Sequence, residues 1–522
     1  MSASGTRPAQ ALFSSTTASA TSTDRLRPRR GIDMPDDPAG RPGRTDRACD
    51  VSRPGALAIV LHTHLPYVEG FDTWPFGEEW LWEAASATYR PLLDLLERHS
   101  HGPAVTVSVT PVLADQLAAR GVAPRFDRFL NSTRELVYGA EIDDLRRQGL
   151  PGEAAALEVL RRRYRETCRP SGAAIRDLAR DLVRVATWTS SATHAILPLV
   201  ATPEGLRAQL GVGVDGHRRR AGDWAGGLWL PECAYSPGLD DALAEAGVRT
   251  TCVDLTDRLG RGSRDHLQPY RTTAGTVLLP LDRSLMDLVW SDGAMPAGAP
   301  YLDSHHLTRY RLRAWSNDGR PWCPRRARER ARSDASVFVR AVRERVATGG
   351  LATVAFDTEF LGHAWAEGLW WLESVLDEAV AQGLQITHAD LAGGPESRAR
   401  ASALPDAAAT TTTWGRGHDL STWNGPRVAA LANETVRLER AVVDAGPRAT
   451  PRAWRELLAA QSSDWAFLRT FATAGDYPDR RFADHAAALR SELAAPGTLP
   501  SELRGLAPHI EEAMSAGRVG PR

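Results

Sequence analysis

Apolar runs of about four to eight residues alternate with amphipathic stretches along most of the chain. Such runs are typical of strands buried in a parallel sheet, and the amphipathic stretches are typical of the helices that connect them. We count about eight candidate strands, at 56–61, 105–110, 183–188, 227–230, 249–254, 276–283, 351–356 and 384–391. Polar residues gather at their carboxyl ends. This pattern predicts an α/β barrel with its active site at that face.

Two regions depart from the alternation. Residues 120–182 read as mostly helical, with Arg- and Glu-rich faces, and we expect an insertion packed beside the barrel. Beyond Pro426 the strand signals end, and helices are predicted over 427–445, 451–473, 479–495 and 501–517. The chain is therefore expected to divide into a disordered extension at 1–54, a catalytic barrel at 55–400 with its insertion at about 120–182, a loop or linker at 401–426 and a helical domain at 427–518.

Composition narrows the class of protein. The net charge is −1 and the isoelectric point about 6.9, so no global charge favours nucleic acid or an anionic membrane. No apolar run reaches 18 residues, and residues 1–30 lack the apolar segment of a secretory signal. The five cysteines are scattered, with no CxxC pair. We expect a cytoplasmic protein without a metal site or disulfide framework.

Two acids follow apolar runs in a way that indicates chemistry. In GLWLPECAY, residues 227–235, the run ends at Pro231 and Glu232 follows at once; in AFDTEFLGHAWAEG, residues 355–368, the run ends at Asp357. A carboxyl at the mouth of a buried strand is costly to place, so it is informative. Two such acids facing each other suit cleavage of a glycosidic bond.

Histidines and tryptophans accompany these acids. His62 and His64 lie one residue apart after the first run and point the same way, and His194 follows a later run. These histidines could serve in structural hydrogen bonds, as metal ligands or in contacts with the substrate. The 16 tryptophans outnumber the 9 tyrosines and the 11 phenylalanines. Core packing accounts for many, and the others are candidate platforms on which sugar rings stack.

Several stretches together resemble the family 57 glycoside hydrolases, and among these the 1,4-α-glucan branching enzymes. They are LHTHLPYV (61–68), SATHAILPL (191–199), GLWLPECAYSPGLDDALAEAGVRT (227–250), VWS (289–291), FDTEFLGHAWAEG (356–368) and QSSDWAFL (461–468). The resemblance covers residues 55–495. It implies an incomplete (β/α)7 TIM-like barrel, a helical C-terminal domain over the cleft, an α-glucan substrate and no cofactor.

The resemblance also implies roles for single residues. Glu232 falls on the nucleophile and Asp357 on the general acid/base of a retaining double displacement, whose carboxyls are roughly 5–5.5 Å apart. The implied sugar contacts are His62, His64, His194, His363 and Asp464. The candidate stacking residues are Trp229, Trp290, Trp365, Trp370, Trp414 and Trp423, of which we favour Trp290 and Trp423.

Two departures from the family pattern leave open which group, a sugar hydroxyl or water, accepts the transferred glucan chain. Met295 stands where branching members carry a loop tyrosine, with Tyr301 as a candidate substitute, and Thr411 stands where the family has a glutamate. The alternatives are an α-glucan hydrolase, a 4-α-glucanotransferase, a degenerate glucan-binding protein, and a metal-dependent deacetylase or mannosidase that uses His62, His64 and an Asp. The oligomeric state is left undecided.

Overall fold

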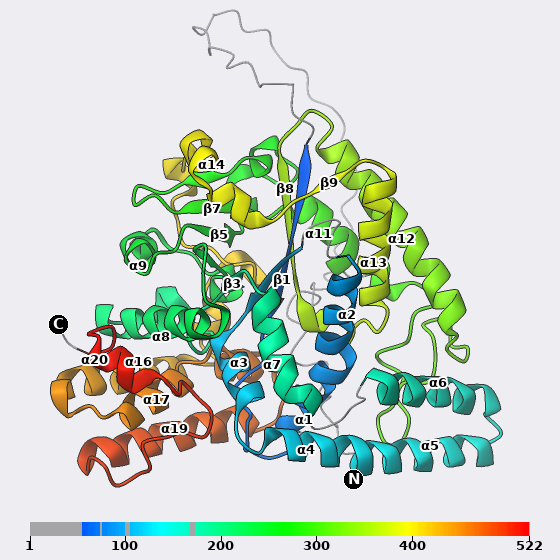
Figure 1. Ribbon diagram of the computed structural model, residues 1–522, viewed down its shortest axis with the longest axis horizontal. Helices are drawn as coiled ribbons and strands as arrows, with labels where there is room; N and C mark the ends of the chain where they lie inside the picture. The colour runs from blue at the N-terminus through cyan, green and yellow to red at the C-terminus, as the bar shows by residue number, and fades with distance from the viewer. Residues whose placement is uncertain (1–54, 74–75, 100–104, 168–172, 292, 521–522) are drawn as a thin grey trace, which may run out of the picture.

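The computed structural model describes residues 55–73, 76–99, 105–167, 173–291 and 293–520 (Figure 1). The extension predicted to be disordered, residues 1–54, lies outside these ranges. Among the described residues, no helix combines the length and the apolar character that crossing a bilayer requires.

One sheet organises the structure, with its strands in the order β10-β6-β7-β5-β4-β3-β2-β1-β8, and with β9 also paired to β1. All paired strands are parallel except β6 and β7. The strands are β1 (Ala56–Thr63), β2 (Thr106–Val109), β3 (Trp188–Thr189), β4 (Gly227–Leu228), β5 (Thr250–Val253), β6 (Tyr270–Arg271), β7 (Val277–Pro280), β8 (Leu351–Asp357), β9 (Gln385–Ile386) and β10 (Ser402–Ala403).

The sheet curls toward closure. Just past β7, Leu281 bridges in parallel to Thr353 of β8, and the Asp282 N–H donates to the Thr353 carbonyl at 2.8 Å. The parallel strands β1, β2, β3, β4, β5, β7 and β8 therefore form the incomplete TIM-like barrel that the sequence predicts. Their carboxyl ends gather at one rim, as expected for this architecture.

Helices surround the sheet on three sides (Figure 1). Those nearest the barrel are α1 (Glu78–Ala84), α2 (Arg90–Arg98), α3 (Pro111–Ala118), α8 (Pro203–Ala221), α9 (Asp240–Glu245), α10 (Thr256–Leu259), α11 (Arg283–Trp290), α12 (Pro324–Arg345) and α13 (Gly368–Ala381). The segment between β2 and β3 adds α4 (Val122–Arg128), α5 (Glu135–Arg147), α6 (Pro151–Thr167) and α7 (Ala173–Val185).

The C-terminal helices lie below the sheet in Figure 1 (orange to red), beside α8. They are α16 (Ala429–Ala445), α17 (Pro451–Ala460), α18 (Ser463–Phe471), α19 (Tyr477–Ala494) and α20 (Ile510–Ser515). The preceding segment contains α14 (Pro395–Arg400) and α15 (Ser421–Asn424). Thr450 caps α17, because its hydroxyl accepts from the Ala453 N–H, as the sequence predicts.

Three predicted elements differ in the structure. The strand expected at 183–188 is mostly the end of α7, and only Trp188–Thr189 pair as a strand. The helix expected at 451–473 breaks after α17 and restarts at α18. The helix expected at 501–517 is wrong in its first half, because backbone N–H groups there bind side chains elsewhere: Gly505 donates to Glu69 and Ala507 to Asp115.

Candidate active site

The turn that carries Glu232 is shaped by its neighbours in sequence. Gly227 opens β4, since a β-carbon there would lie 2.0 Å from the indole ring of Trp188. After the strand, Pro231 begins a single 3-10 turn, and Glu232 and Cys233 adopt left-handed backbone angles, with φ of 56° and 49°. Such angles cost about 1–3 kcal/mol for residues other than glycine, and they persist where the surroundings enforce them.

Trp414 fixes Glu232 from the opposite side. Its indole N–H donates to Glu232 Oε2 at 2.9 Å, and its backbone N–H donates to the Glu232 carbonyl at 3.1 Å. Burial raises the pKa of Glu232 to about 7; the Trp414 hydrogen bond lowers it and the charge of Asp464 raises it. Glu232 as a whole residue is half-buried. Near neutral pH it is poised between its two protonation states.

Asp357 ends β8 and lies beside His62 of β1 in the parallel register. Burial raises its pKa well above the ordinary value, and the neighbouring charges of Glu232 and Glu359 raise it further. Asp357 is also partly exposed. The two predicted acids thus lie close enough for the charge of one to shift the pKa of the other, and the Trp414 donor favours the charged form of Glu232.

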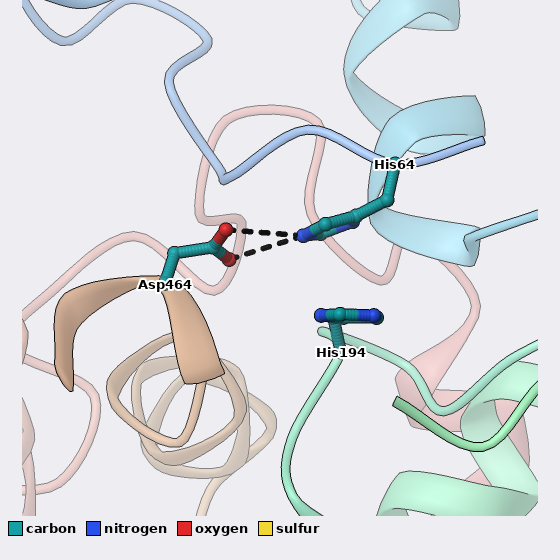
Figure 2. Close-up of side chains that lie close together, drawn as sticks. All are labelled: His64, His194 and Asp464. Carbon is teal, nitrogen blue, oxygen red and sulfur yellow. Dashed lines mark hydrogen bonds and ion pairs between the residues drawn. The ribbon is translucent and has the colours of Figure 1, made fainter. Parts of the chain in front are cut away.

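The rings of His62, His64 and His194 are stacked, and Figure 2 shows two of them, His64 and His194. His64 and His194 lie 3.9 Å apart between ring centroids, and His62 packs on Trp229 at 4.9 Å. Burial, and then the neighbouring imidazoles, lower the pKa values of His62 and His194 well below the ordinary value. These two rings are therefore neutral, and they present nitrogen donors and acceptors to a polyhydroxylated ligand.

The C-terminal helices complete this cluster. The first turn of α18 supplies Asp464, whose carboxylate lies 3.1 Å from His64 Nε2 (Figure 2), and Ser463, whose hydroxyl lies 2.8 Å from His194 Nδ1. His194 Nε2 in turn lies 3.0 Å from His62 Nε2. The predicted contribution of Asp464 from the helical region is thus seen in the geometry.

His64, His194 and Asp464 are also the described residues that come nearest to a metal-binding set, with ligand atoms within 4.8 Å of one another. Their geometry argues against that use. The two imidazole planes are within 21° of parallel and stacked, so their in-plane lone pairs run side by side instead of converging on one ion. Both His194 nitrogens have protein partners. The group contains His194 in place of the His62 that the deacetylase or mannosidase alternative used.

The predicted tryptophans divide into two groups. Trp414 meets the edges of Trp229 and Trp290, each at 4.9 Å, so these three form one aromatic wall at the nucleophile. Trp365 is 3% exposed and packs against Tyr301, and Trp423 is 3% exposed within the core that includes the C-terminal helices. The structure places neither Trp365 nor Trp423 in this wall.

His363 lies farther along the loop after β8. It lines a cavity of about 640 Å³ between the helical insertion and residues 302–313. The described lining of this cavity contains neither of the two acids nor the stacked histidines. The backbone N–H of His363 donates to the carbonyl of Glu359 at 3.2 Å.

Tyr301 does not take the place of the missing loop tyrosine. It is fully buried, and its hydroxyl donates to Asp334 Oδ2 of α12 at 2.7 Å. Met295 is 8% exposed and packs in the same apolar cluster as Trp290. The expectation that Tyr301 substitutes at this loop is wrong because a buried acceptor holds its hydroxyl away.

Sequence reasoning gave no role to Glu359 or Ser463. Glu359 is 1% exposed, accepts from the Tyr89 hydroxyl at 2.5 Å and from the His64 N–H at 3.1 Å, and has a pKa raised to about 7 by burial. The position of Glu359, a third acid two residues after Asp357, was a signal in the sequence that could have placed it near the site. Ser463 gave none, because a helical serine is usually solvated or capping.

Comparison with known proteins agrees with this geometry. Residues 58–384 match the sequence model of glycosyl hydrolase family 57, and residues 427–496 match the model described as 1,4-alpha-glucan branching enzyme, C-terminal. A 1,4-alpha-glucan branching enzyme of Thermococcus kodakarensis is 29% identical, across 83% of this chain and 72% of that protein. A probable 1,4-alpha-glucan branching enzyme of Mycobacterium tuberculosis is 30% identical, across 88% and 95%.

Solved structures show the same likeness. The crystal structure of the GH57-type branching enzyme of Pyrococcus horikoshii superposes with a TM-score of 0.77 at 25% identity. The alignment covers 90% of this chain and 97% of that one. It therefore includes both the barrel and the helices that follow it.

Proposed function

Because the chain belongs to glycosyl hydrolase family 57, we propose that it is a 1,4-α-glucan branching enzyme. The observation that carries the proposal is the pair of partly exposed acids at one rim of the barrel, Glu232 and Asp357, with the hydrogen-bond donors on Glu232. The match of residues 427–496 to a branching-enzyme C-terminal model, and the named relatives, support branching over other reactions of an α-glucan.

The proposed reaction has two displacements. Glu232 attacks the anomeric carbon of an α-1,4-linked glucose, and Asp357 gives its proton to the departing 4-oxygen, which leaves a covalent glycosyl-enzyme. Asp357 then takes the proton of an acceptor 6-hydroxyl as that oxygen attacks the anomeric carbon and releases Glu232. The product is an α-1,6 branch, and both carboxyls return to their starting states.

The surrounding residues have supporting roles in this proposal. The neutral imidazoles of His62 and His194 and the Asp464–His64 pair offer hydrogen bonds to the hydroxyls of the bound glucose. The wall formed by Trp229, Trp290 and Trp414 gives the site an apolar side. The Trp414 indole N–H donates to Glu232 and favours its charged form.

The natural polymer and the place of the reaction belong to the proposal as well. We infer a glycogen-like α-glucan, built in the cytoplasm. Support comes from the scattered cysteines without CxxC pairs and from a net charge of −1, which offers no global attraction for nucleic acid or for an anionic membrane.

Products made from amylose test the proposal. The protein should shift the iodine spectrum and create α-1,6 linkages, counted by debranching and chain-length analysis, without a matching rise in reducing ends. Glu232→Gln and Asp357→Asn should each lower bond cleavage by a thousandfold or more, on the order of nucleophile losses in other enzymes. Glu396→Gln, on an exposed side chain of α14, is the control.

One observation favours an α-glucan hydrolase as the second candidate. Met295 occupies the loop position, and Tyr301 is buried against Asp334, so no tyrosine of this loop guards the intermediate from water. Equal rates of bond cleavage and reducing-end formation in the same assay would establish that candidate and refute branching. Activity that survives Glu232→Gln would refute the mechanism itself.

A further inference from the structure

Two buried ion pairs are formed by the adjacent residues Asp282 and Arg283, just after β7. Arg283, the first residue of α11, places its Nε 2.7 Å from Asp254 Oδ2, just past β5. The preceding residue, Asp282, pairs with Arg345 of α12 at 2.6 Å. Nothing in the proposed reaction uses either pair, although buried pairs cost desolvation energy and are weak contributors to stability.

Only the first pair reaches the nucleophile. A second nitrogen of Arg283, Nη2, donates to the backbone carbonyl of Trp414. Trp414 donates both of its N–H groups to Glu232, as described above. By contrast, the second donor of Arg345 binds the carbonyl of Ser263, away from the site.

Asp254 holds the neighbouring segment as well. Its backbone carbonyl accepts from the Thr412 hydroxyl at 2.6 Å. Thr412 also exchanges two backbone hydrogen bonds with Tyr235, at 2.9 and 3.0 Å, just beyond the turn that carries Glu232. The segment 412–414 is thus tied on one side to Asp254 and Arg283 and on the other to the nucleophile turn.

The nucleophile turn needs such an anchor. Glu232 and Cys233 both have positive φ, a conformation that relaxes unless contacts enforce it. The contacts from Trp414 do so, and Trp414 keeps its place through Arg283. A guanidinium suits this task because its rigid fork serves a carboxylate and a carbonyl at the same time.

We propose that Arg283 and Asp254 are positioning residues that hold Trp414 against Glu232 and so aim the nucleophile. The inference rests on the proposed role of Glu232 but not on the acceptor. Although burial by itself raises the pKa of Asp254, Arg283 and the Thr256 contacts hold it below the ordinary value. The contribution proposed for the pair is geometric: Arg283 joins Asp254 to the Trp414 carbonyl.

The test compares Arg283→Gln with Arg345→Gln. Each variant removes one of the two buried ion pairs formed by the adjacent residues Asp282 and Arg283, so a general loss of stability affects both. The assay counts all glucosidic bonds cleaved in amylose, whichever acceptor is used, across pH 5 to 9. The charged and titratable groups facing Glu232 are unchanged in both variants: Asp357, His64 and Asp464.

Arg283→Gln should lower kcat by roughly 10- to 100-fold, as expected for a nucleophile displaced by a fraction of an ångström to one ångström, and leave KM within about twofold. Because the Trp414 donor lowers the pKa of Glu232, its loss should also move the ascending limb of the pH profile to higher pH. Arg345→Gln should leave kcat within about threefold of the wild-type value, and the ascending limb of its pH profile should not move.

Amide hydrogen exchange gives a readout that needs no activity. Peptides spanning 230–236 and 411–416 should exchange faster in Arg283→Gln and unchanged in Arg345→Gln. If Arg283→Gln does not fold, Arg283→Lys replaces it, because an ammonium keeps the charge beside Asp254 but cannot also span to the Trp414 carbonyl.

The proposal would be overturned if the Arg283 and Arg345 variants changed kcat and amide exchange equally. It would also be overturned if a folded Arg283 variant left the ascending limb of the pH profile in place. A wild type that cleaves no glucan would refute the function, whereas the exchange comparison would still decide the positioning.

Discussion

Three acids lie within reach of one another at the rim of the barrel, and solvent access separates their roles. Glu232 and Asp357 are partly exposed, while Glu359 is 1% exposed and has both Tyr89 and the His64 backbone as donors. A buried acid cannot touch a sugar, but its charge still acts on its neighbours. Glu359 raises the pKa of Asp357, after burial and Glu232.

Glu359→Gln should make the stability of the protein less sensitive to pH. The folded pKa of Glu359 is about 7 against an ordinary 4.5, so its favourable contribution is complete below about pH 4.5 and is lost as the pH rises through 7. Glutamine keeps an acceptor oxygen and does not titrate. Relative to wild type, the variant should gain up to about 3 kcal/mol between pH 5 and 8.5, measured by urea unfolding.

The exposed substitution Glu396→Gln is the control for this measurement, and its difference from wild type should be the same at both pH values. If the difference in unfolding free energy between Glu359→Gln and wild type were also the same at both pH values, the buried carboxyl would not titrate as described.

At the residue scale, the sequence predicts candidate residues of the site more readily than it predicts which residues contact one another. Glu232, Asp357 and His62 are predicted as site residues because each comes at the end of an apolar run, and His194 because it belongs to a polar strand exit. Asp254 and Arg283 were visible in the same way, yet their service to Trp414 depends on a contact between residues 131 positions apart. No spacing rule predicts such a contact.

At the scale of elements, the break between α17 and α18 is the feature that matters most for function. The helical pattern continues through 451–473, so sequence predicts one helix. In the structure the helix stops at Ala460 and restarts at Ser463, which turns Ser463 and Asp464 toward His194 and His64. Tertiary hydrogen bonds override local propensity here, which explains why the barrel strands were predicted more accurately than this helix.

The other end of α18 permits a stability test. Ala472 ends the helix with φ of 52°, a left-handed conformation that a β-carbon disfavours. Ala472→Gly should therefore raise the free energy of unfolding by about 1 kcal/mol, measured by chemical denaturation. The matched control Ala466→Gly, inside the same helix, should lower it by about 1 kcal/mol or more. Destabilisation by both substitutions would contradict the assignment of strain to Ala472.

At the scale of the whole molecule, the barrel and the C-terminal helices share one apolar core. Leu65, Tyr67 and Trp80 lie in the same buried cluster as Trp465 and Tyr477. Trp80 meets Tyr477 edge to face at 5.7 Å, and the Tyr67 hydroxyl donates to the Leu503 carbonyl at 2.9 Å. Sequence predicted the succession of barrel and helices, but it could not show that they are fused through this core.

Thermal unfolding should accordingly be one cooperative transition. Trp465→Ala removes a fully buried ring and should cost about 3–5 kcal/mol. Because the core is shared, it should lower the melting temperature for the loss of barrel and helical structure alike. Differential scanning calorimetry of both proteins measures this. Two resolved transitions, with only one of them moved by Trp465→Ala, would show separate folding units.

The restart of the helix at Ser463 also has a consequence for synthesis. Both candidate catalytic acids leave the ribosome well before Ser463 and Asp464, which hold the histidines beside them. A growing chain therefore carries its reactive groups for some time in an unassembled state. The contacts of His194 with Ser463 and of His64 with Asp464 can form only after α18 has been synthesised, so we expect the histidine cluster to be completed late in translation.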